Sequence, residues 1–453
     1  MSDGKEAVTH VHHETEYQRK HPETFSRFLW RQKVILAVAF VGYVCAYLVR
    51  NNFKLMSNAM VEQYGWNKLN VASLLTCFGV TYGIGKFVMG ALADRTSLRK
   101  LFGGALALSA ILCIVMGFIH NFWVIVAVLL VVGLIQGALA PSSQAMIAKY
   151  FPNHTRGGAV AGWNVSQNVG SALLPLIIAG LGVVAPGNLA LGFILPGVFV
   201  LVIAVFIWKF GGDGPQTEGF GTLREMYGEA GEPNVDESGD AGMSYWRLIG
   251  KYVFMNPGIL IVGFINAALY FVRFGIEDWM PIYLSEDGGF TEHQYLTAVS
   301  VLEWVAIPGT LLFAWLVVKF ANRVTVIGAV GLFAMAALVF YYETIENTGT
   351  ASYIQLLIVS GLLGTLIYGP QLIVNVLTLN FVPLKVSGTA LGFVGLMAYL
   401  LGDLGANWIM PIVADNLNWT AAYLIVAAIS VISGIGYLVL SGREKKTVTL
   451  DED

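Results

Sequence analysis

Twelve apolar segments, each about long enough to cross a membrane, follow one another along this chain. A helix needs about 20 residues to span the hydrocarbon core, and in lipid its backbone must satisfy its own hydrogen bonds. The series therefore predicts an all-α membrane protein with twelve transmembrane helices. The predicted spans are residues 33–55, 70–92, 101–119, 122–148, 157–183, 188–210, 255–283, 293–318, 324–343, 351–378, 385–411 and 417–441.

A long polar stretch, residues 211–254, divides the twelve segments into six and six. It begins with a run of glycines and a proline and continues with acidic residues, which indicates a solvated linker. We expect two pseudo-symmetric halves, 33–210 and 255–441, with tails at 1–32 and 442–453. Only 12% of the residues are charged, against about 25% in soluble proteins, which excludes a soluble globular fold.

Basic residues are concentrated at alternate ends of the apolar segments. They precede the first segment, follow the second and fourth, and recur in the linker and the C-terminal tail. Because loops rich in Lys and Arg stay in the cytoplasm, both tails and the linker should be cytoplasmic, as in a multi-pass protein of the inner (plasma) membrane. Lys68 is the clear exception, since it belongs to a loop that should face the other side.

Two arginines lie inside apolar segments in matching settings. The two sets are Tyr43, Tyr47 and Arg50, and Asn266, Tyr270 and Arg273. Their spacing is i, i+4, i+7 in both cases, which places each set on one helix face. An arginine in the middle of a membrane helix costs about 2.5–3.5 kcal/mol on insertion scales, so such a residue is functional by default.

The matched placement of Arg50 and Arg273 predicts a site for a phosphate group. Duplicated halves are typical of secondary transporters, whose site lies between the halves near the midplane. A guanidinium fork matches phosphate oxygens, and two of them supply two positive charges. Without an anion between them these charges should repel, which would disfavour closure. Alternatively, either arginine could bind backbone carbonyls or pair with a structural acid such as Asp278 or Glu303.

The loop at residues 90–100 resembles the loop signature of the major facilitator superfamily. Its acid and base, Asp94 and Arg95, are expected to pair with helix ends and to latch the cytoplasmic side. In the second half Val318 stands where an aspartate is usual, which puts that half of the latch in doubt. The alternative is a charge cluster that serves only to orient the chain.

Further motifs resemble the organophosphate:inorganic phosphate antiporter family of this superfamily. They lie at residues 47–53, 82–86, 163–170, 270–279, 303–310 and 368–370. Members of that family exchange glycerol 3-phosphate, hexose 6-phosphates or phosphoglycerates for inorganic phosphate. The likeness runs from about residue 28 to residue 440, and the pair of arginine motifs is its most specific part.

The resemblance implies a role for each matching residue. Arg50 and Arg273 match the two phosphate-binding arginines of the family. Residues that match the lining of its cavity are Tyr43, Tyr47, Tyr270, Tyr368, Tyr399, Asn164 and Gln167. Lys86, Asp278 and Glu303 match charged groups that exchange ion pairs around the arginines as the halves rock. For the tyrosines the alternative is a plain packing role, because tyrosine is common in cores and interfaces.

Some positions depart from the family pattern. Gln167 replaces a histidine, and an amide cannot hold a proton charge near neutral pH. Asn51 replaces a lysine, which removes one possible partner for Asp278. Leu391 and Val394 stand where the hexose-phosphate carriers have an acid and a lysine. Asp403 is a further buried acid, which could contact a substrate hydroxyl or make a bond between helices.

The chain lacks the motifs of covalent or nucleotide-driven chemistry. It contains no P-loop, no Ser/His/Asp arrangement and no Cys-x-x-Cys pair, so we expect a carrier rather than an enzyme, with no cofactor and no metal. Its expected partners are a phosphate ester, inorganic phosphate and the lipid bilayer, with no nucleic acid. A monomer suffices, because the predicted site lies within one chain.

The predicted function is exchange of an organic phosphate monoester, such as glycerol 3-phosphate or a sugar phosphate, for inorganic phosphate by alternating access. Two alternatives stay open. One is a membrane sensor of external sugar phosphate that keeps the transporter fold. The other is a proton-coupled transporter of a different small anion, in which Glu303, Asp278 or Asp403 carries the proton.

Overall fold

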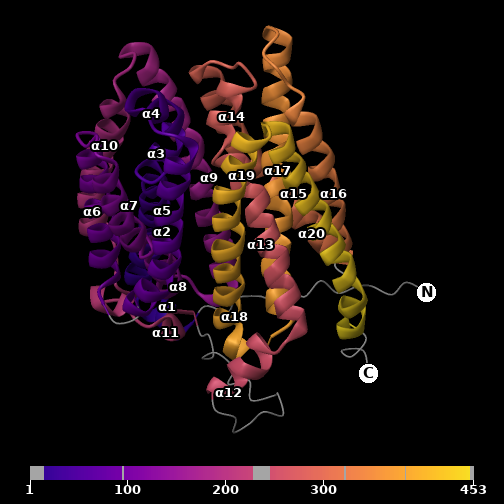
Figure 1. Cartoon of the computed structure of the whole chain (residues 1–453). Coiled ribbons are helices and arrows are strands. Elements are labelled where there is room, and N and C mark those ends of the chain that lie inside the picture. Colours follow the sequence, from indigo (N-terminus) through magenta and orange to yellow (C-terminus); the bar gives the residue numbers. More distant parts are fainter. Residues whose placement is uncertain (1–14, 94–95, 228–244, 321–322, 383, 449–453) are drawn as a thin grey trace.

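A computed structural model describes residues 15–93, 96–227, 245–320, 323–382 and 384–448. Within these ranges the chain forms helices that are joined by turns and loops, and it forms no strand. Figure 1 shows two groups of long helices, with the first half of the chain in indigo and magenta and the second half in orange and yellow. The expected all-α architecture of two halves is thus what the chain adopts.

Within the described residues, each half contains six long spans, some of them made of two or three consecutive helical segments. The first half contains α2 (Pro22–Leu48), α3 (Asn52–Leu55), α4 (Ser57–Tyr64), α5 (Lys68–Ala93), α6 (Leu98–Met116), α7 (Phe122–Gln136), α8 (Leu139–Tyr150), α9 (Asn153–Val184) and α10 (Leu189–Phe210). The second half contains α13 (Pro257–Glu277), α14 (Met280–Glu286), α15 (Glu292–Lys319), α16 (Val324–Glu343), α17 (Thr350–Asn380), α18 (Leu384–Met397), η4 (Ala398–Asp403), α19 (Leu404–Asn416) and α20 (Trp419–Val448). Shorter helices outside the spans are α1 (Glu16–Lys20), η1 (Pro215–Glu218), α11 (Leu223–Tyr227), α12 (Tyr245–Ile249) and η2 (Gly250–Phe254).

Eleven helices or helix pairs in the described ranges are long and apolar enough to cross a membrane. The predicted span 70–92 is not among these eleven. It corresponds to α5, which has 26 residues and packs along α7 and α19 inside the bundle. The chain is therefore a multi-pass membrane protein.

A close approach of α5 to the fourth span positions part of the site. A side chain at Gly137 would clash with the backbone of Gly85 on α5, and one at Gly85 would clash with the backbone of Leu134. Small residues at such contacts let membrane helices come together. The approach brings Tyr82 on α5 close to Gln136, since both bind the same arginine.

Four of the spans are interrupted. The first breaks at residues 49–51, the fourth at 137–138 and the seventh at 278–279, while the eleventh contains the π-helical turn η4. Inside a membrane, non-helical backbone is tolerated where it is buried in protein or lines a cavity, and π-helical turns are frequent at functional sites. The interruptions therefore indicate where the functional site lies.

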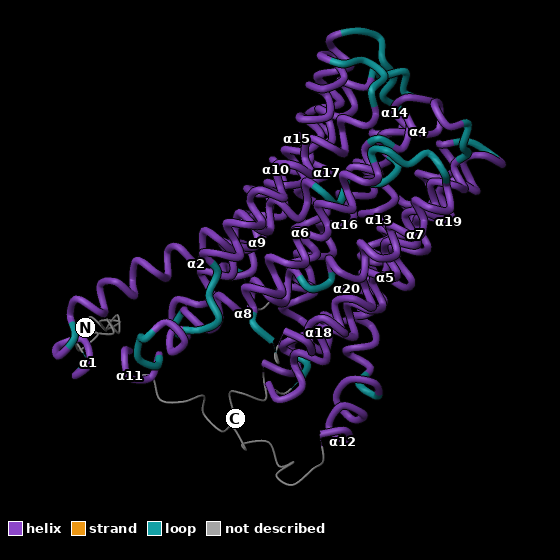
Figure 2. Tube along the Cα trace, turned by 90° about the vertical axis from the view of Figure 1, so that its left-hand side faces the viewer, coloured by secondary structure: helices purple, strands orange, loops and turns teal. Residues whose placement is uncertain are grey.

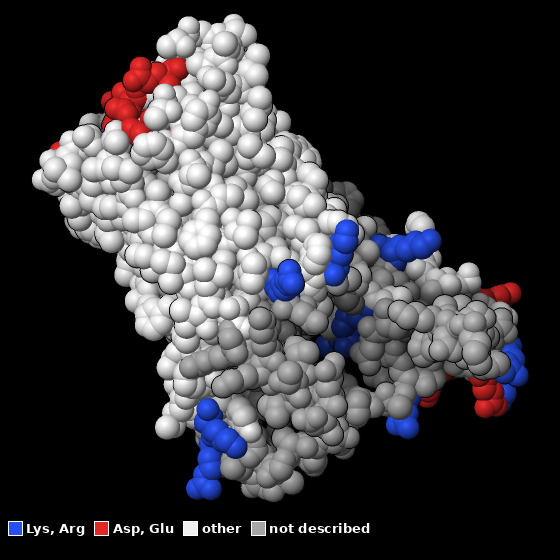
Figure 3. Space-filling view, turned by 90° about the vertical axis from the view of Figure 1, so that its right-hand side faces the viewer, with Lys and Arg blue, Asp and Glu red and all other residues white. Residues whose placement is uncertain are grey.

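The two ends of the bundle differ in charge. In Figures 1 and 2, α4 and α14 lie at one end, and α1, α11 and α12 lie at the other. We call these the α4/α14 end and the α1/α12 end. On the face shown in Figure 3, a patch of Asp and Glu without Lys or Arg marks the α4/α14 end, whereas the Lys and Arg side chains lie toward the α1/α12 end, with some Asp and Glu among them.

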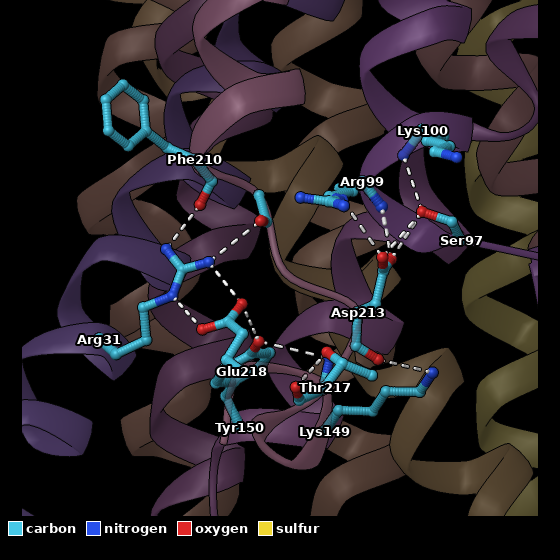
Figure 4. A network of polar contacts seen from close by, with 12 residues as sticks. Arg31, Ser97, Arg99, Lys100, Lys149, Tyr150, Phe210, Asp213, Thr217 and Glu218 are labelled. Carbon is cyan, nitrogen blue, oxygen red and sulfur yellow. Dashed lines mark hydrogen bonds and ion pairs between the residues drawn. The ribbon is translucent and has the colours of Figure 1, made fainter. Parts of the chain in front are cut away.

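The first part of the linker is bound to the first half rather than free, contrary to the expectation of a solvated tether (Figure 4). Arg31 binds Glu218 with two charged hydrogen bonds, from Nε to Oε2 (2.6 Å) and from Nη2 to Oε1 (2.7 Å). Tyr150 also donates to Glu218, at 2.6 Å. Asp213 accepts from the hydroxyl of Ser97 and the backbone N–H of Arg99.

Removing the charge of Glu218 should loosen this attachment in a pH-dependent way. Burial opposes ionisation of Glu218, but the hydrogen bonds from Arg31 and Tyr150 outweigh it and hold the pKa below its usual value. A depressed carboxylate pKa stabilises the fold above the unfolded pKa of about 4.3, and this contribution is lost as the pH falls through the folded pKa. In detergent, Glu218→Gln should thus lower the melting temperature by roughly 2–4 °C near neutral pH, and the difference from the wild type should shrink progressively as the pH falls below about 4.

The exposed ion pair of Glu16 with Lys20 supplies a matched control, because surface pairs contribute little to stability. Glu16→Gln should melt with the wild type at every pH. Equal melting of Glu218→Gln and wild type at neutral pH would show that the linker contacts do not stabilise the fold.

Candidate functional site

Three of the four interruptions, those in the first, seventh and eleventh spans, line one cavity of about 110 Å³ between the halves, and the fourth span reaches it through the bond of Gln136 to Arg50. A single water needs roughly 10–15 Å³ by this measure, so the cavity has room for a small anion. The first half lines it with Tyr43, Tyr47, Arg50, Asn51, Lys54, Leu75, Phe78, Gly79, Tyr82, Lys86, Gln167 and Ser171. The second half lines it with Tyr270, Arg273, Phe274, Glu277, Asp278, Gln371, Tyr399 and Asp403.

Arg50 lies in the turn between α2 and α3, not on a continuous helix as the spacing predicted. It is 6% exposed. Its Nε donates to Oε1 of Gln136 (2.6 Å) and its Nη1 to the hydroxyl of Tyr82 (3.3 Å). The guanidinium carbon lies 4.5 Å from the ring centroids of both Tyr47 and Tyr82, an arrangement that stabilises a cation.

The charge of Arg50 has no counter-ion in the described part of the chain. Its buried Nη2 makes no hydrogen bond there, and neither Asp278 nor Glu303 pairs with it, because both carboxylates are bound elsewhere. The alternative of a structural ion pair therefore does not apply to Arg50. Arg50 thus lines the cavity as a buried cation whose charge is balanced by no carboxylate of the described residues.

Arg273 lies on α13, on the same face as Asn266 and Tyr270, as the spacing predicted. Its Nε donates to both carboxylate oxygens of Glu277, at 3.0 and 3.2 Å, and its Nη2 donates to the hydroxyl of Tyr368 at 2.7 Å. Arg273 is thus already neutralised, and the expectation of two uncompensated, mutually repelling arginines is wrong. The sequence reasoning missed Glu277, although its i+4 spacing from Arg273 was a usable signal.

Asp278 pairs across the two halves with a residue that the sequence reasoning also missed. Lys54 Nζ lies 2.7 Å from Asp278 Oδ1, and the Asp278 side chain is 2% exposed. Lys54 therefore supplies the charge that Asn51 lacks. Its position four residues after Arg50, on the same side of the chain, was the available signal.

Two of the predicted charged groups lie near the arginines. Glu303 is linked to Arg273 through Tyr368, and Lys86 shares the ring of Tyr82 with Arg50. Glu303 accepts a hydrogen bond from Asn168 of the first half (2.9 Å) and one from Tyr368 (3.1 Å). Since Tyr368 also binds Arg273, it links the acid to the arginine. The Lys86 ammonium lies 5.0 Å from the ring of Tyr82 and 5.5 Å from that of Tyr399.

The remaining predicted residues are placed as follows. Tyr43, Tyr47, Tyr270, Tyr399 and Gln167 line the cavity, whereas Tyr368 reaches it only through Arg273. Asn164 is exposed and does not line it; Asn168, one turn further along α9, is the asparagine that joins the halves. Asp403 lines the cavity, accepts from Asn407 (2.8 Å) and packs against Gly79 of the first half. Asp94 and Arg95 lie outside the described residues.

Known proteins share the sequence features of this chain. Residues 39–406 match the Major Facilitator Superfamily. The phosphoglycerate transporter protein of Salmonella typhimurium is 31% identical over 410 residues, which cover 89% of this chain and 87% of the relative. The hexose-6-phosphate:phosphate antiporter of Escherichia coli (strain K12) is 30% identical over 87% of both chains.

A solved structure shares the fold. The bacterial homolog to the human lysosomal transporter Spinster, in an inward-facing and unoccupied conformation, superposes with a TM-score of 0.73 at 15% identity, over 92% of this chain and 98% of that one. The chain belongs to the Major Facilitator Superfamily and, within it, to the family of organophosphate:inorganic phosphate antiporters.

Proposed function

We propose that this protein is an inner-membrane carrier that exchanges a phosphate monoester for inorganic phosphate by alternating access. The observation that carries the proposal is Arg50, a buried cation with a free Nη2 donor and no counter-ion among the described residues, on a cavity that it shares with Arg273. Phosphate oxygens accept hydrogen bonds from guanidinium forks in bidentate geometry. A phosphoryl group held between Arg50 and Arg273 therefore joins the two halves.

The contacts between the halves indicate which side of the carrier is closed. Moving from the cavity toward the α4/α14 end, Lys54 binds Asp278, Asn58 binds Ser285, and Lys68 binds both Glu286 and Asp415 at 2.8 Å. These layers hold that end shut. Described basic residues lie toward the other end (Figure 3), so we propose that the α1/α12 end faces the cytoplasm. Lys68, the exception to the charge rule, then fastens the outer side.

Binding must favour one arrangement of the halves over the other for transport to occur. A phosphoryl group contacts arginines of both halves only when the halves approach around it, so its binding energy supports closure. The organic part of the substrate then lies among the tyrosine side chains and Gln167, which line the same cavity. One chain forms the whole cavity, and a monomer therefore suffices for transport.

Exchange in proteoliposomes tests this function. Vesicles that contain the purified protein and are loaded with phosphate should take up labelled phosphate at least about tenfold faster than vesicles without internal phosphate. Competition by glycerol 3-phosphate, glucose 6-phosphate and 3-phosphoglycerate then ranks the esters. Binding of an ester without flux would identify a sensor instead, and uptake driven by a pH gradient without internal phosphate would identify a proton-coupled transporter.

A further inference from the structure

Glu277 binds the Nε side of Arg273, the guanidinium that an incoming phosphoryl group contacts in the proposed function. The Nε of Arg273 is engaged by both oxygens of Glu277, its Nη2 by Tyr368 and its Nη1 by Gln371. The side chains of Arg273 and Glu277 are only 12% and 13% exposed, so water screens their interaction weakly. A phosphate anion that approaches Arg273 therefore meets a carboxylate that is already bound to the same guanidinium.

The groups around Glu277 do not relieve this competition. Lys54 on α3 is near, but its ammonium is engaged by Asp278, the next residue after Glu277. Glu303 on α15 and Tyr368 on α17 also face the Arg273–Glu277 pair, and Glu303 adds a second carboxylate. Every fixed charge close to Glu277 other than Arg273 is thus either negative or already paired with an acid.

The charges that line the cavity fix what it can hold. Four cations, Arg50, Lys54, Lys86 and Arg273, face three carboxylates, Glu277, Asp278 and Asp403. With all of them ionised, and before Glu303 behind Tyr368 is counted, the lining carries one net positive charge, so it compensates no more than an anion of charge minus one. A phosphate dianion leaves one uncompensated negative charge in a poorly screened site, where like charges a few ångströms apart repel strongly.

We propose that Glu277 is a resident counter-ion that competes with the phosphoryl group for Arg273, so that one proton enters the site with each phosphate dianion. This inference rests on the proposed function. The proton comes from the solution on the side of binding and resides on Glu277 or on a phosphoryl oxygen. It leaves with the ligand on the other side. Exchange of phosphate for phosphate then moves no net proton, but affinity depends on pH.

Binding of inorganic phosphate to the purified full-length protein provides the test. For the wild type, the apparent Kd should rise by about tenfold between pH ~6 and ~8, as the monoanion disappears. For Glu277→Gln, the lining gains a positive charge, so the Kd at pH ~8 should be about tenfold lower than that of the wild type and should no longer rise with pH. Glu346→Gln, the same change on an exposed residue, should retain the behaviour of the wild type.

Two other roles give different results. If Glu277 only orients Arg273, Glu277→Gln weakens binding at every pH and keeps the slope of the wild type, which overturns the proposal. If the wild type binds no phosphate, the proposed function itself fails. A measurement on the wild type alone decides the matter should the variant not fold: in weakly buffered solution at pH ~8, phosphate binding should take up about one proton per ligand, and uptake of none overturns the inference.

Discussion

Replacing Arg50 by lysine should reduce phosphate exchange by about 10²- to 10³-fold, the largest loss from any single conservative change in the cavity. Removal of one preorganised charged donor from a buried site has an effect of this size. Lysine keeps the charge but presents it as a point, whereas Arg50 uses separate nitrogens for Gln136 and Tyr82 and keeps Nη2 free. An ammonium group cannot hold both partners and still offer a fork to phosphate.

The measurement is the initial rate of phosphate exchange in proteoliposomes that contain equal amounts of folded protein. Arg27→Lys makes the same substitution on an exposed residue near the start of α2 and should retain the wild-type rate. Arg273→Lys should reduce exchange less than Arg50→Lys, because Arg273 already shares its charge with Glu277. Equal rates for Arg50→Lys and wild type would show that a point charge suffices and would remove the bidentate argument.

The fold could be predicted from the sequence because each membrane span can be recognised from its own apolar residues. An apolar run of about 20 residues has few alternatives to a membrane helix, and Lys and Arg mark the alternating loops. The breaks in the spans could not be predicted in the same way. Arg50, Asn51 and Gly137 stand in those turns, but single polar residues and glycines also occur within continuous membrane helices, so they do not mark a break. Tertiary packing, not local composition, determines those positions.

The sequence was sufficient to predict the two arginines of the site. It was less informative about the side chains that bind or neighbour these arginines. Glu277 and Lys54 were within reach, since each lies four residues from an arginine on the same span. Gln136 was not, because its bond to Arg50 depends on the close packing of α5 against the fourth span and on the turn at 137–138. Such partners arise where irregular backbone of one helix meets another, and spacing along one chain segment does not encode them.

Breaking the ion pair between Lys54 and Asp278 should shift the protein away from the conformation that is closed at the α4/α14 end. The pair joins the two halves, and Asp278 is 2% exposed. Removal of one member of a buried pair leaves the other charge without compensation and costs about 3–5 kcal/mol, whereas removal of both is often close to neutral. We therefore expect Asp278→Asn or Lys54→Met to open that end, and the double variant to close it again in part.

The reactivity of a cysteine at position 58 reports this equilibrium. Asn58 lies between the cavity and the α4/α14 end, is 8% exposed, and binds Ser285 of the other half at 3.1 Å. In an Asn58→Cys background, each single variant should raise the rate of thiol alkylation by at least about tenfold, since the lost pair energy favours the open end. The double variant should react more slowly than either single one. Chains without Asn58→Cys give the background from Cys45, Cys77 and Cys113. Single variants that react no faster than their parent would mean that contacts other than this ion pair keep the outer end shut.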